Sequence, residues 1–150
     1  MCTADEADNP HEEEEEAIVR RSNIEIETGL HLKEDKQWIF FTIEESRKLI
    51  YLHGALCESL RLLPLVALEH KDPIRPDILP SGIYLHQNSR VIVSFYLTGR
   101  KETVWEIDFL ESKPERWISP CGKIKHESSY KFLVLNVGPR TCLVKEMAFI

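Results

Sequence analysis

The stretch KQWIFFTIEESRKLIYLHGAL, residues 36–56, carries the strongest local structure signals of this chain. Its first part, QWIFF, is rich in aromatic and β-branched residues and predicts a strand. Thr42 and Glu45 follow at the Thr-x-x-Glu spacing of a capping box, in which each side chain accepts a hydrogen bond from an amide of the other residue. The stretch therefore predicts a strand that turns into a helix of about residues 43–63, which Pro64 ends because proline breaks a helix interior.

Leucines recur along this predicted helix at steps of three and four residues and form one apolar stripe. We expect the stripe to be core or a dimer interface, and its candidate interface residues are Leu49, Leu52, Leu56 and Leu60. The charged residues of the helix occupy the rest of its circumference, as on a face that water covers. These residues are Glu44, Arg47, Lys48, Glu58 and Arg61.

The N-terminal sequence and the composition predict an acidic tail followed by one soluble domain. The chain has 150 residues and a net charge of -6, and eight acidic residues lie among the first 16 positions. A block of like charge cannot bury enough surface to order itself, so we expect a disordered tail at residues 1–17 and one domain at residues 18–150. With no basic leader and no apolar run of about 18 residues, an intracellular protein without a membrane segment is expected.

The remainder divides into a proline-rich crossing segment, residues 64–80, and a strand-rich half, residues 81–150. Runs of β-branched and aromatic residues predict strands at 82–86, 90–98, 103–110, 130–137 and 141–149, with an earlier edge strand in SNIEIE at 22–27. The expected fold class is α+β: a mostly antiparallel sheet of five to seven strands with one long amphipathic helix.

Catalytic and metal-binding patterns are weak in this sequence. Cys121 and His126 have no second ligand pair at zinc spacing, and the four cysteines form no CxxC motif. Glu106 and Asp108 alternate on one predicted strand and could form an acid/base pair, but solvated acidic side chains are the ordinary outcome there. The sequence has neither a nucleophile elbow nor a glycine-rich phosphate loop. We therefore expect no enzyme, no metal site and no cofactor.

Binding remains, because basic and aromatic residues interleave in the turns of the strand-rich half. Aromatic rings stack on bases while cations follow the phosphates of a single strand. The candidate nucleic-acid-binding residues are Arg90, Arg100, Lys101, Arg116, Trp117, Lys123, Lys125 and Tyr130. The alternative is a protein–protein interaction module or dimeric adaptor whose acidic tail maintains solubility.

Three segments also resemble a known family. FTIEESRKLIYLHGAL, SGIYLHQNSRVIVSFYL and TVWEIDFL are similar, in altered order, to the strands and helix of the PC4-like family of transcriptional coactivators. The resemblance implies single-stranded DNA binding along the sheet and a homodimer formed through the helix. With the basic and aromatic pattern, the expected partner is single-stranded DNA or RNA. The expected location is nuclear or cytoplasmic, away from membranes.

Overall fold

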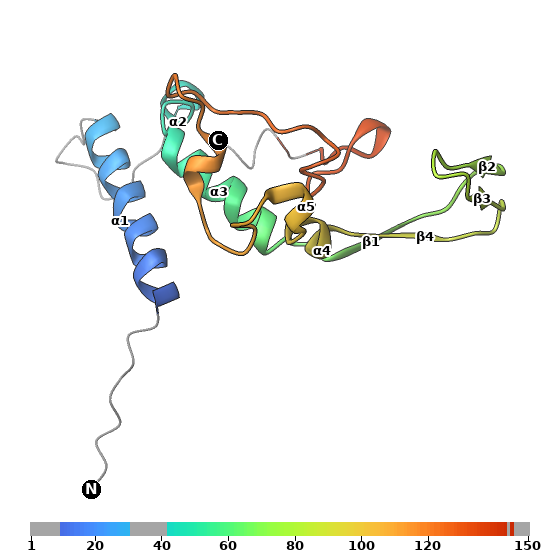
Figure 1. The fold of residues 1–150 in the computed structure, drawn as a ribbon. Coiled ribbons are helices and arrows are strands. Elements are labelled where there is room, and N and C mark those ends of the chain that lie inside the picture. Colours follow the sequence, from blue (N-terminus) through green and yellow to red (C-terminus); the bar gives the residue numbers. More distant parts are fainter. Residues whose placement is uncertain (1–9, 31–41, 144, 146–150) are drawn as a thin grey trace, which may run out of the picture.

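The computed structural model describes residues 10–30, 42–143 and 145. A group of helices forms one end of the molecule, and a two-stranded ribbon extends away from it (Figure 1). The expected strand QWIFF lies outside the described residues. In chain order the elements are α1 (Pro10–Leu30), α2 (Ile43–Ser46), α3 (Ile50–Leu62), β1 (Leu68–Lys71), β2 (Asp77–Ile78), β3 (Tyr84–Leu85), β4 (Val91–Ser94), α4 (Phe95–Gly99), α5 (Glu102–Trp105), η1 (Pro114–Trp117) and η2 (Gly138–Arg140).

The expected capping box starts α2. Glu45 N–H donates to the Thr42 hydroxyl at 3.3 Å, and Thr42 N–H donates to Glu45 Oε2 at 2.8 Å. The expected helix of residues 43–63 is nevertheless divided, because α2 ends at Ser46 and Leu49 adopts a non-helical ψ of 70° before α3 begins. Leu49 is only 4% exposed there, so burial of its side chain favours the break that the helical periodicity does not show.

Helix α1 replaces two expected features. It covers Pro10–Leu30, where the sequence pattern predicted the end of a disordered tail and a strand at residues 22–27. Pro10 loses nothing at the helix start, where an N–H would be unpaired in any case, and Glu12 and Glu13 lie favourably at the positive end of the helix dipole. Glutamate is also a good helix former, so a solvated acidic run and a helix are compatible.

Glu25 of α1 completes the start of α3. Its Oε1 accepts a hydrogen bond from Tyr51 N–H and its Oε2 accepts one from Leu52 N–H, both at 2.8 Å. Leu49, at the N-cap of α3, has no side-chain capping bond. The Glu25 carboxylate therefore satisfies two amides that a helix start leaves unpaired. Arg21, one turn earlier in α1, lies over the Tyr51 ring at 4.2 Å.

Replacing this carboxylate should weaken the attachment of α1 to α3. For Glu25→Ala we expect the free energy of unfolding to fall by about 1 kcal/mol, the usual cost of losing a helix cap. Urea unfolding measures that loss, and hydrogen exchange should show faster exchange at the amides of Tyr51 and Leu52. Glu27→Ala, at an exposed position of the same helix, is the matched control. Unchanged exchange at both amides would contradict the capping role.

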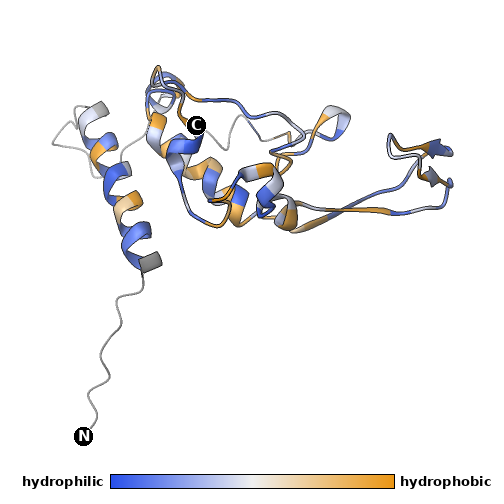
Figure 2. Cartoon of the chain, viewed as in Figure 1, coloured by the Kyte–Doolittle hydropathy of each residue, from blue (hydrophilic) through white to orange (hydrophobic). Residues whose placement is uncertain are grey.

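Two short antiparallel pairs make up the ribbon. Strand β1 pairs with β4 in the register Leu68↔Ser94 to Lys71↔Val91, and β2 pairs with β3 through Ile78↔Tyr84. Strands β1 and β2 both fall in the segment expected to be a crossing between two halves. Apolar residues recur along the ribbon (Figure 2), and many of its large apolar side chains are exposed, among them Ile78 at 63%.

Much of the expected meander is not a ladder. Strand β4 ends at Ser94, whose hydroxyl accepts from Leu97 N–H and begins α4. The segment expected as a strand at 103–110 contains α5 and a turn, and residues 130–137 form turns and irregular structure. The Arg61 side chain donates hydrogen bonds to the carbonyl oxygens of Gly99, Phe109 and Glu111. These carbonyls therefore bond to a side chain and not to a neighbouring strand. The α+β class with five to seven strands stays a prediction, since expected strand residues lie outside the described ranges.

The buried face of α3 differs from the leucine stripe. Leu49 is buried, Leu52 and Leu60 are half-buried, and Leu56 is 41% exposed. The fully buried positions include Glu58 and Arg61, which the sequence pattern assigned to a solvated face, so that expectation is wrong. The stripe's role as a dimer interface stays a prediction. Within the described part of the chain, no helix combines the length and the apolar character that crossing a membrane requires.

Candidate functional site

A buried ion pair on α3 is the centre of the site. Arg61 Nε donates to Glu58 Oε2 at 2.9 Å, and Arg61 Nη2 donates to Glu58 Oε1 at 2.8 Å. Both side chains are 0% exposed. The two residues lie three positions apart, so one helix turn holds them side by side in a two-pronged contact.

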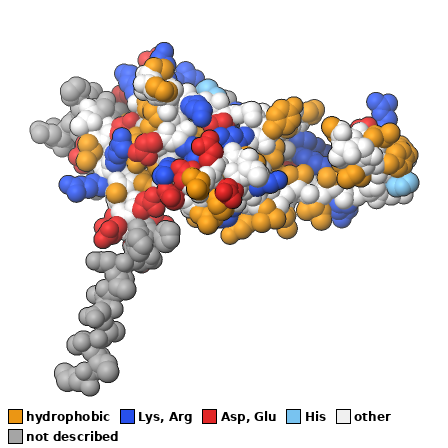
Figure 3. Space-filling model, viewed as in Figure 1, with side chains coloured by type: hydrophobic (Ala, Val, Ile, Leu, Met, Phe, Trp, Pro, Cys, Tyr) orange, Lys and Arg blue, Asp and Glu red, His pale blue; other side chains and the backbone are white. Residues whose placement is uncertain are grey.

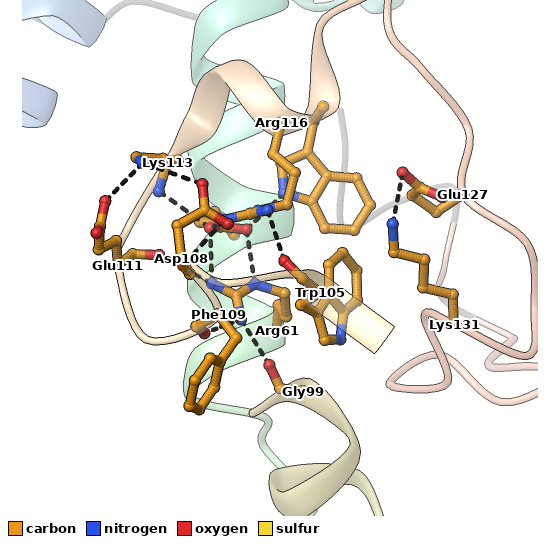
Figure 4. Close-up of polar contacts among 12 residues, drawn as sticks. Arg61, Gly99, Trp105, Asp108, Phe109, Glu111, Lys113, Arg116, Glu127 and Lys131 are labelled. Carbon is orange, nitrogen blue, oxygen red and sulfur yellow. Dashed lines mark hydrogen bonds and ion pairs between the residues drawn. The ribbon is translucent and has the colours of Figure 1, made fainter. Parts of the chain in front are cut away.

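Arg61 also forms hydrogen bonds to the segment 99–111, which follows the ribbon (Figure 4). Its Nη1 donates to the carbonyl oxygens of Gly99 at 2.5 Å and Phe109 at 2.7 Å. Its Nη2 donates to the carbonyl oxygen of Glu111 at 2.9 Å. Together with the bonds to Glu58, these contacts use every N–H of the guanidinium. The buried cation is therefore fully satisfied and connects α3 to three points of the segment 99–111.

A second arginine joins the network from η1. Arg116 Nη1 donates to the Trp105 carbonyl oxygen at 3.1 Å, and its Nη2 lies 3.0 Å from Asp108 Oδ1. Arg116 Nε lies 3.4 Å from Glu58 Oε1. Glu58 is thus shared between two guanidinium groups that come from distant parts of the sequence. We call Glu58, Arg61 and Arg116 the ionic triad.

The triad keeps its carboxylate charged. Burial by itself would raise the pKa of Glu58, but hydrogen bonds from Arg61, Lys113 N–H and Trp117 outweigh it, together with the positive charge of Arg61. The pKa of Glu58 therefore lies below its ordinary value. Because the folded pKa is lowered, this stabilisation is present at neutral pH and is lost as the pH falls through that lowered pKa.

Two tryptophans form the apolar side of the site. Trp105 is 0% exposed and Trp117 is 2% exposed, with ring centroids 5.6 Å apart. Lys131 Nζ lies over the Trp105 ring at 4.6 Å, and the Phe132 ring meets the Trp117 ring edge-on at 4.6 Å. Two consecutive residues of a later segment therefore rest on the tryptophan pair.

That later segment leads to Cys142. Asn136 and Gly138 have positive φ values of 60° and 63°, which turn the chain back on itself. Cys142 N–H donates to the Leu135 carbonyl oxygen at 2.9 Å, and Lys145 N–H donates to the Cys142 carbonyl oxygen at 3.2 Å. Hydrogen bonds thus hold both the backbone N–H and the carbonyl of Cys142, whose thiol is free and half-buried.

The residues proposed for nucleic-acid binding do not form one surface. Only Arg116 and Trp117 lie in the site, and both point into buried contacts. Lys and Arg side chains alternate with Asp and Glu over the visible face (Figure 3). The other candidates are scattered: Arg90 pairs with Asp72, Arg100 lies over the Tyr96 ring, Lys125 pairs with Glu127, and Lys101, Lys123 and Tyr130 are exposed.

Residues 19–149 match the cytochrome P450 family. The chain belongs to the cytochrome P450 family. It is 50% identical over 110 residues to alkane hydroxylase MAH1 of Arabidopsis thaliana, a match that covers 73% of this chain and 22% of the relative. It is 46% identical over 112 residues to noroxomaritidine synthase 2 of Narcissus aff. pseudonarcissus MK-2014, which covers 73% and 22%. Cytochrome P450 86B1 of Arabidopsis thaliana is 44% identical over 109 residues, or 73% and 19%.

This P450 chain spans about a fifth of the length of the curated relatives it matches, with shares of 19% to 22%. The matching segment still contains the ionic triad and Cys142, since both lie within residues 19–149.

The family overturns several predictions made from the sequence. The PC4-like resemblance is wrong, and so is the non-enzymatic function with its single-stranded nucleic-acid partner. The alternative of an interaction module or dimeric adaptor falls with it. The expectation of no enzyme is wrong because the relatives are named as a hydroxylase and a synthase. The expectation of a nuclear or cytoplasmic location away from membranes is wrong too, because the chain belongs to the cytochrome P450 family.

Cytochromes P450 hold haem iron through a cysteine thiolate, so the described cysteines can be tested against that role. Cys57 is buried in α3, and burial raises the pKa of its thiol to about 12, which keeps it protonated. Cys121 is exposed in a turn. Cys142 is a half-buried free thiol whose neighbours are fixed by backbone bonds. Of these three residues, Cys142 fits the thiolate ligand of a P450 haem.

The ionic triad was not identified from the sequence, and Cys142 was not singled out as a functional residue. One signal for the triad was available, because Gly54, Glu58 and Arg61 recur at steps of three and four and so share a helix face. Glycine on that face indicates close approach of another backbone, and the Pro114 carbonyl oxygen lies 2.7 Å from where a Gly54 side chain would begin. A charged pair on a closely packed face points to a buried ion pair.

Proposed function

We propose that this chain is the thiolate-bearing part of a cytochrome P450 monooxygenase. The observation that carries the proposal is the family match over residues 19–149 together with the restrained thiol of Cys142. When bound, haem supplies the redox chemistry that activates O₂, and a thiolate ligand donates electron density that favours O–O cleavage.

The chain's own residues then have distinct tasks. Cys142 would hold the iron, and backbone bonds to Leu135 and Lys145 hold the main chain that carries its thiol. The ionic triad holds the segment 99–117 against α3, as its bonds to Gly99, Phe109 and Trp105 indicate. Neither Glu58 nor Arg61 is available to solvent as an acid or base, since both are 0% exposed, and Arg116 is only 11% exposed. The triad therefore acts as support and not as a proton donor.

The proposed substrate class is aliphatic, and the proposed reaction is insertion of one oxygen atom into a C–H bond. The 50% identity to a protein named alkane hydroxylase supports this choice. Electrons would come from a reductase partner, a proposal that the membership of the cytochrome P450 family supports. The proposed location is the membrane surface of the endoplasmic reticulum.

Haem titration tests the thiolate assignment. Ferric haem is added to the full chain and to Cys142→Ser, and Cys121→Ser is the matched control because its thiol is exposed. We expect the native chain and Cys121→Ser to show the absorbance and magnetic circular dichroism of a thiolate-bound haem, and Cys142→Ser to lose that signature. Equal spectra for the three proteins, or no haem binding by the native chain, would contradict the proposal.

A further inference from the structure

Trp117 contacts both the ionic triad and the segment that leads to Cys142. Its indole Nε1–H donates to Glu58 Oε2 at 2.8 Å, on a side chain that is 2% exposed. Its ring also meets Phe132, whose ring centroid lies 4.6 Å away at an interplanar angle of 64°. The residue thus joins α3 to the later segment through one polar and one aromatic contact.

The polar contact fixes how the indole ring lies. An N–H donor on a rigid ring has one direction, so a 2.8 Å bond to a carboxylate held by Arg61 sets the plane of the ring. Hydrogen bonds to charged groups are stronger than neutral ones, and Glu58 keeps its charge because its pKa is lowered. The Trp117 ring, against which Phe132 packs, is therefore held in one orientation.

The backbone of Trp117 adds a second restraint on the same segment. Its carbonyl oxygen accepts from Lys125 N–H at 2.8 Å, and the next residue, Ile118, bridges to Ile124. The segment 118–132 therefore directly follows Trp117 at its first residue and contacts the Trp117 ring at its last.

From Phe132 the restraint reaches the thiol through short-range contacts. Asn136 N–H donates to the Leu133 carbonyl oxygen at 2.7 Å, and Cys142 N–H donates to that of Leu135 at 2.9 Å. Each of these bonds returns to a residue within three positions of Phe132. A change in where Phe132 lies is therefore transmitted to Cys142.

We infer that Trp117 is a positioning residue for the Cys142 thiol, acting through its hydrogen bond to Glu58 and its ring contact with Phe132. The inference rests on the proposed function only in so far as Cys142 would bind haem. The restraint on the thiol is a property of the chain itself.

Alkylation of the thiols tests the inference without haem. The full chain is treated with iodoacetamide, and mass spectrometry follows Cys142, with exposed Cys121 as the internal reference and far-ultraviolet circular dichroism as the indicator of global unfolding. Trp117→Phe keeps a ring and removes the N–H, so we expect the Cys142 rate to rise about tenfold, the equivalent of one hydrogen bond to a charged group. The Cys121 rate and the circular dichroism spectrum should stay unchanged.

Phe132→Leu is the second variant and leaves the Trp117 N–H in place. It should raise the Cys142 rate as Trp117→Phe does, while the indole N–H of Trp117 stays protected from hydrogen exchange because its bond to Glu58 is retained. Tyr130→Phe is the control, since Tyr130 is 91% exposed beside the same segment. If Trp117→Phe unfolds the chain, which circular dichroism would reveal, Phe132→Leu decides the matter.

Three results would overturn the inference: a native Cys142 rate in Trp117→Phe, a native rate in Phe132→Leu, or loss of the native circular dichroism spectrum in both variants. Haem titration of Trp117→Phe supplies the separate arm, in which the thiolate signature should need more haem to develop. A native chain that restrains Cys142 but binds no haem would count against the proposed function and leave this inference standing.

Discussion

Arg61→Met is expected to lower the free energy of unfolding by about 3–5 kcal/mol, the range for removing one partner of a buried ion pair. Methionine fills most of the space, so lost packing contributes little. The loss arises because Glu58 would keep a charge at a position that is 0% exposed, while the carbonyl oxygens of Gly99, Phe109 and Glu111 would lose their donor.

Urea unfolding, followed by tryptophan fluorescence, measures this effect. The matched control is Arg75→Met, which removes the same charge from an exposed position and should change stability by less than about 0.5 kcal/mol. The double variant Glu58→Gln/Arg61→Met should be less destabilised than the sum of the two single variants, because it no longer leaves a charge unpaired. A loss below about 1 kcal/mol in Arg61→Met would show that water reaches Glu58 and that the ionic triad is not a dry support.

Trp105→Ala is expected to cost about 3–5 kcal/mol, as large-to-small changes at fully buried aromatic positions do. Trp105 is 0% exposed, and its indole N–H donates to the Thr98 carbonyl oxygen at 3.0 Å. The ring also faces Lys131 Nζ at 4.6 Å and Arg61 Cζ at 5.1 Å, so its removal leaves these cations without an aromatic face.

Trp105→Phe separates the two contributions, since it keeps an aromatic ring and removes the N–H. We expect this variant to lose about half as much stability as Trp105→Ala in thermal unfolding monitored by circular dichroism. Trp105→Ala should in addition loosen the segment at Lys131, which hydrogen exchange would detect there. Equal losses in the two variants would mean that the hydrogen bond to Thr98, and not the ring, accounts for the effect.

Local features of the fold could be predicted where neighbouring residues decide them. The capping box of Thr42 and Glu45 is present because its two partners lie three positions apart and need no other part of the chain. The strand expected at residues 22–27 failed because Glu25 bonds to the amides of Tyr51 and Leu52, about 26 positions away. Alternation of apolar and polar residues says nothing about such a contact.

The site was harder to predict than the fold. Glu58 and Arg61 have the spacing of an ordinary solvated pair on a helix, and only their burial turns them into a support. Arg116 and Trp117 were singled out for the right residue types but for the wrong partner, because cations beside aromatic rings also describe a buried network. Cys142 lies in a segment expected as a strand, so its exposure and restraint could not be anticipated.

The sequence by itself determined where α2 begins, through a capping box whose partners are near neighbours, and which thiols were present. Only the tertiary structure decided that α3 buries an ion pair, that Arg116 joins it from 55 positions after Arg61, and that Trp117 connects this network to the Cys142 segment. The physical reason is that burial changes what a charge does: in water a carboxylate and a guanidinium gain little from each other, whereas in a dry interior each requires the other.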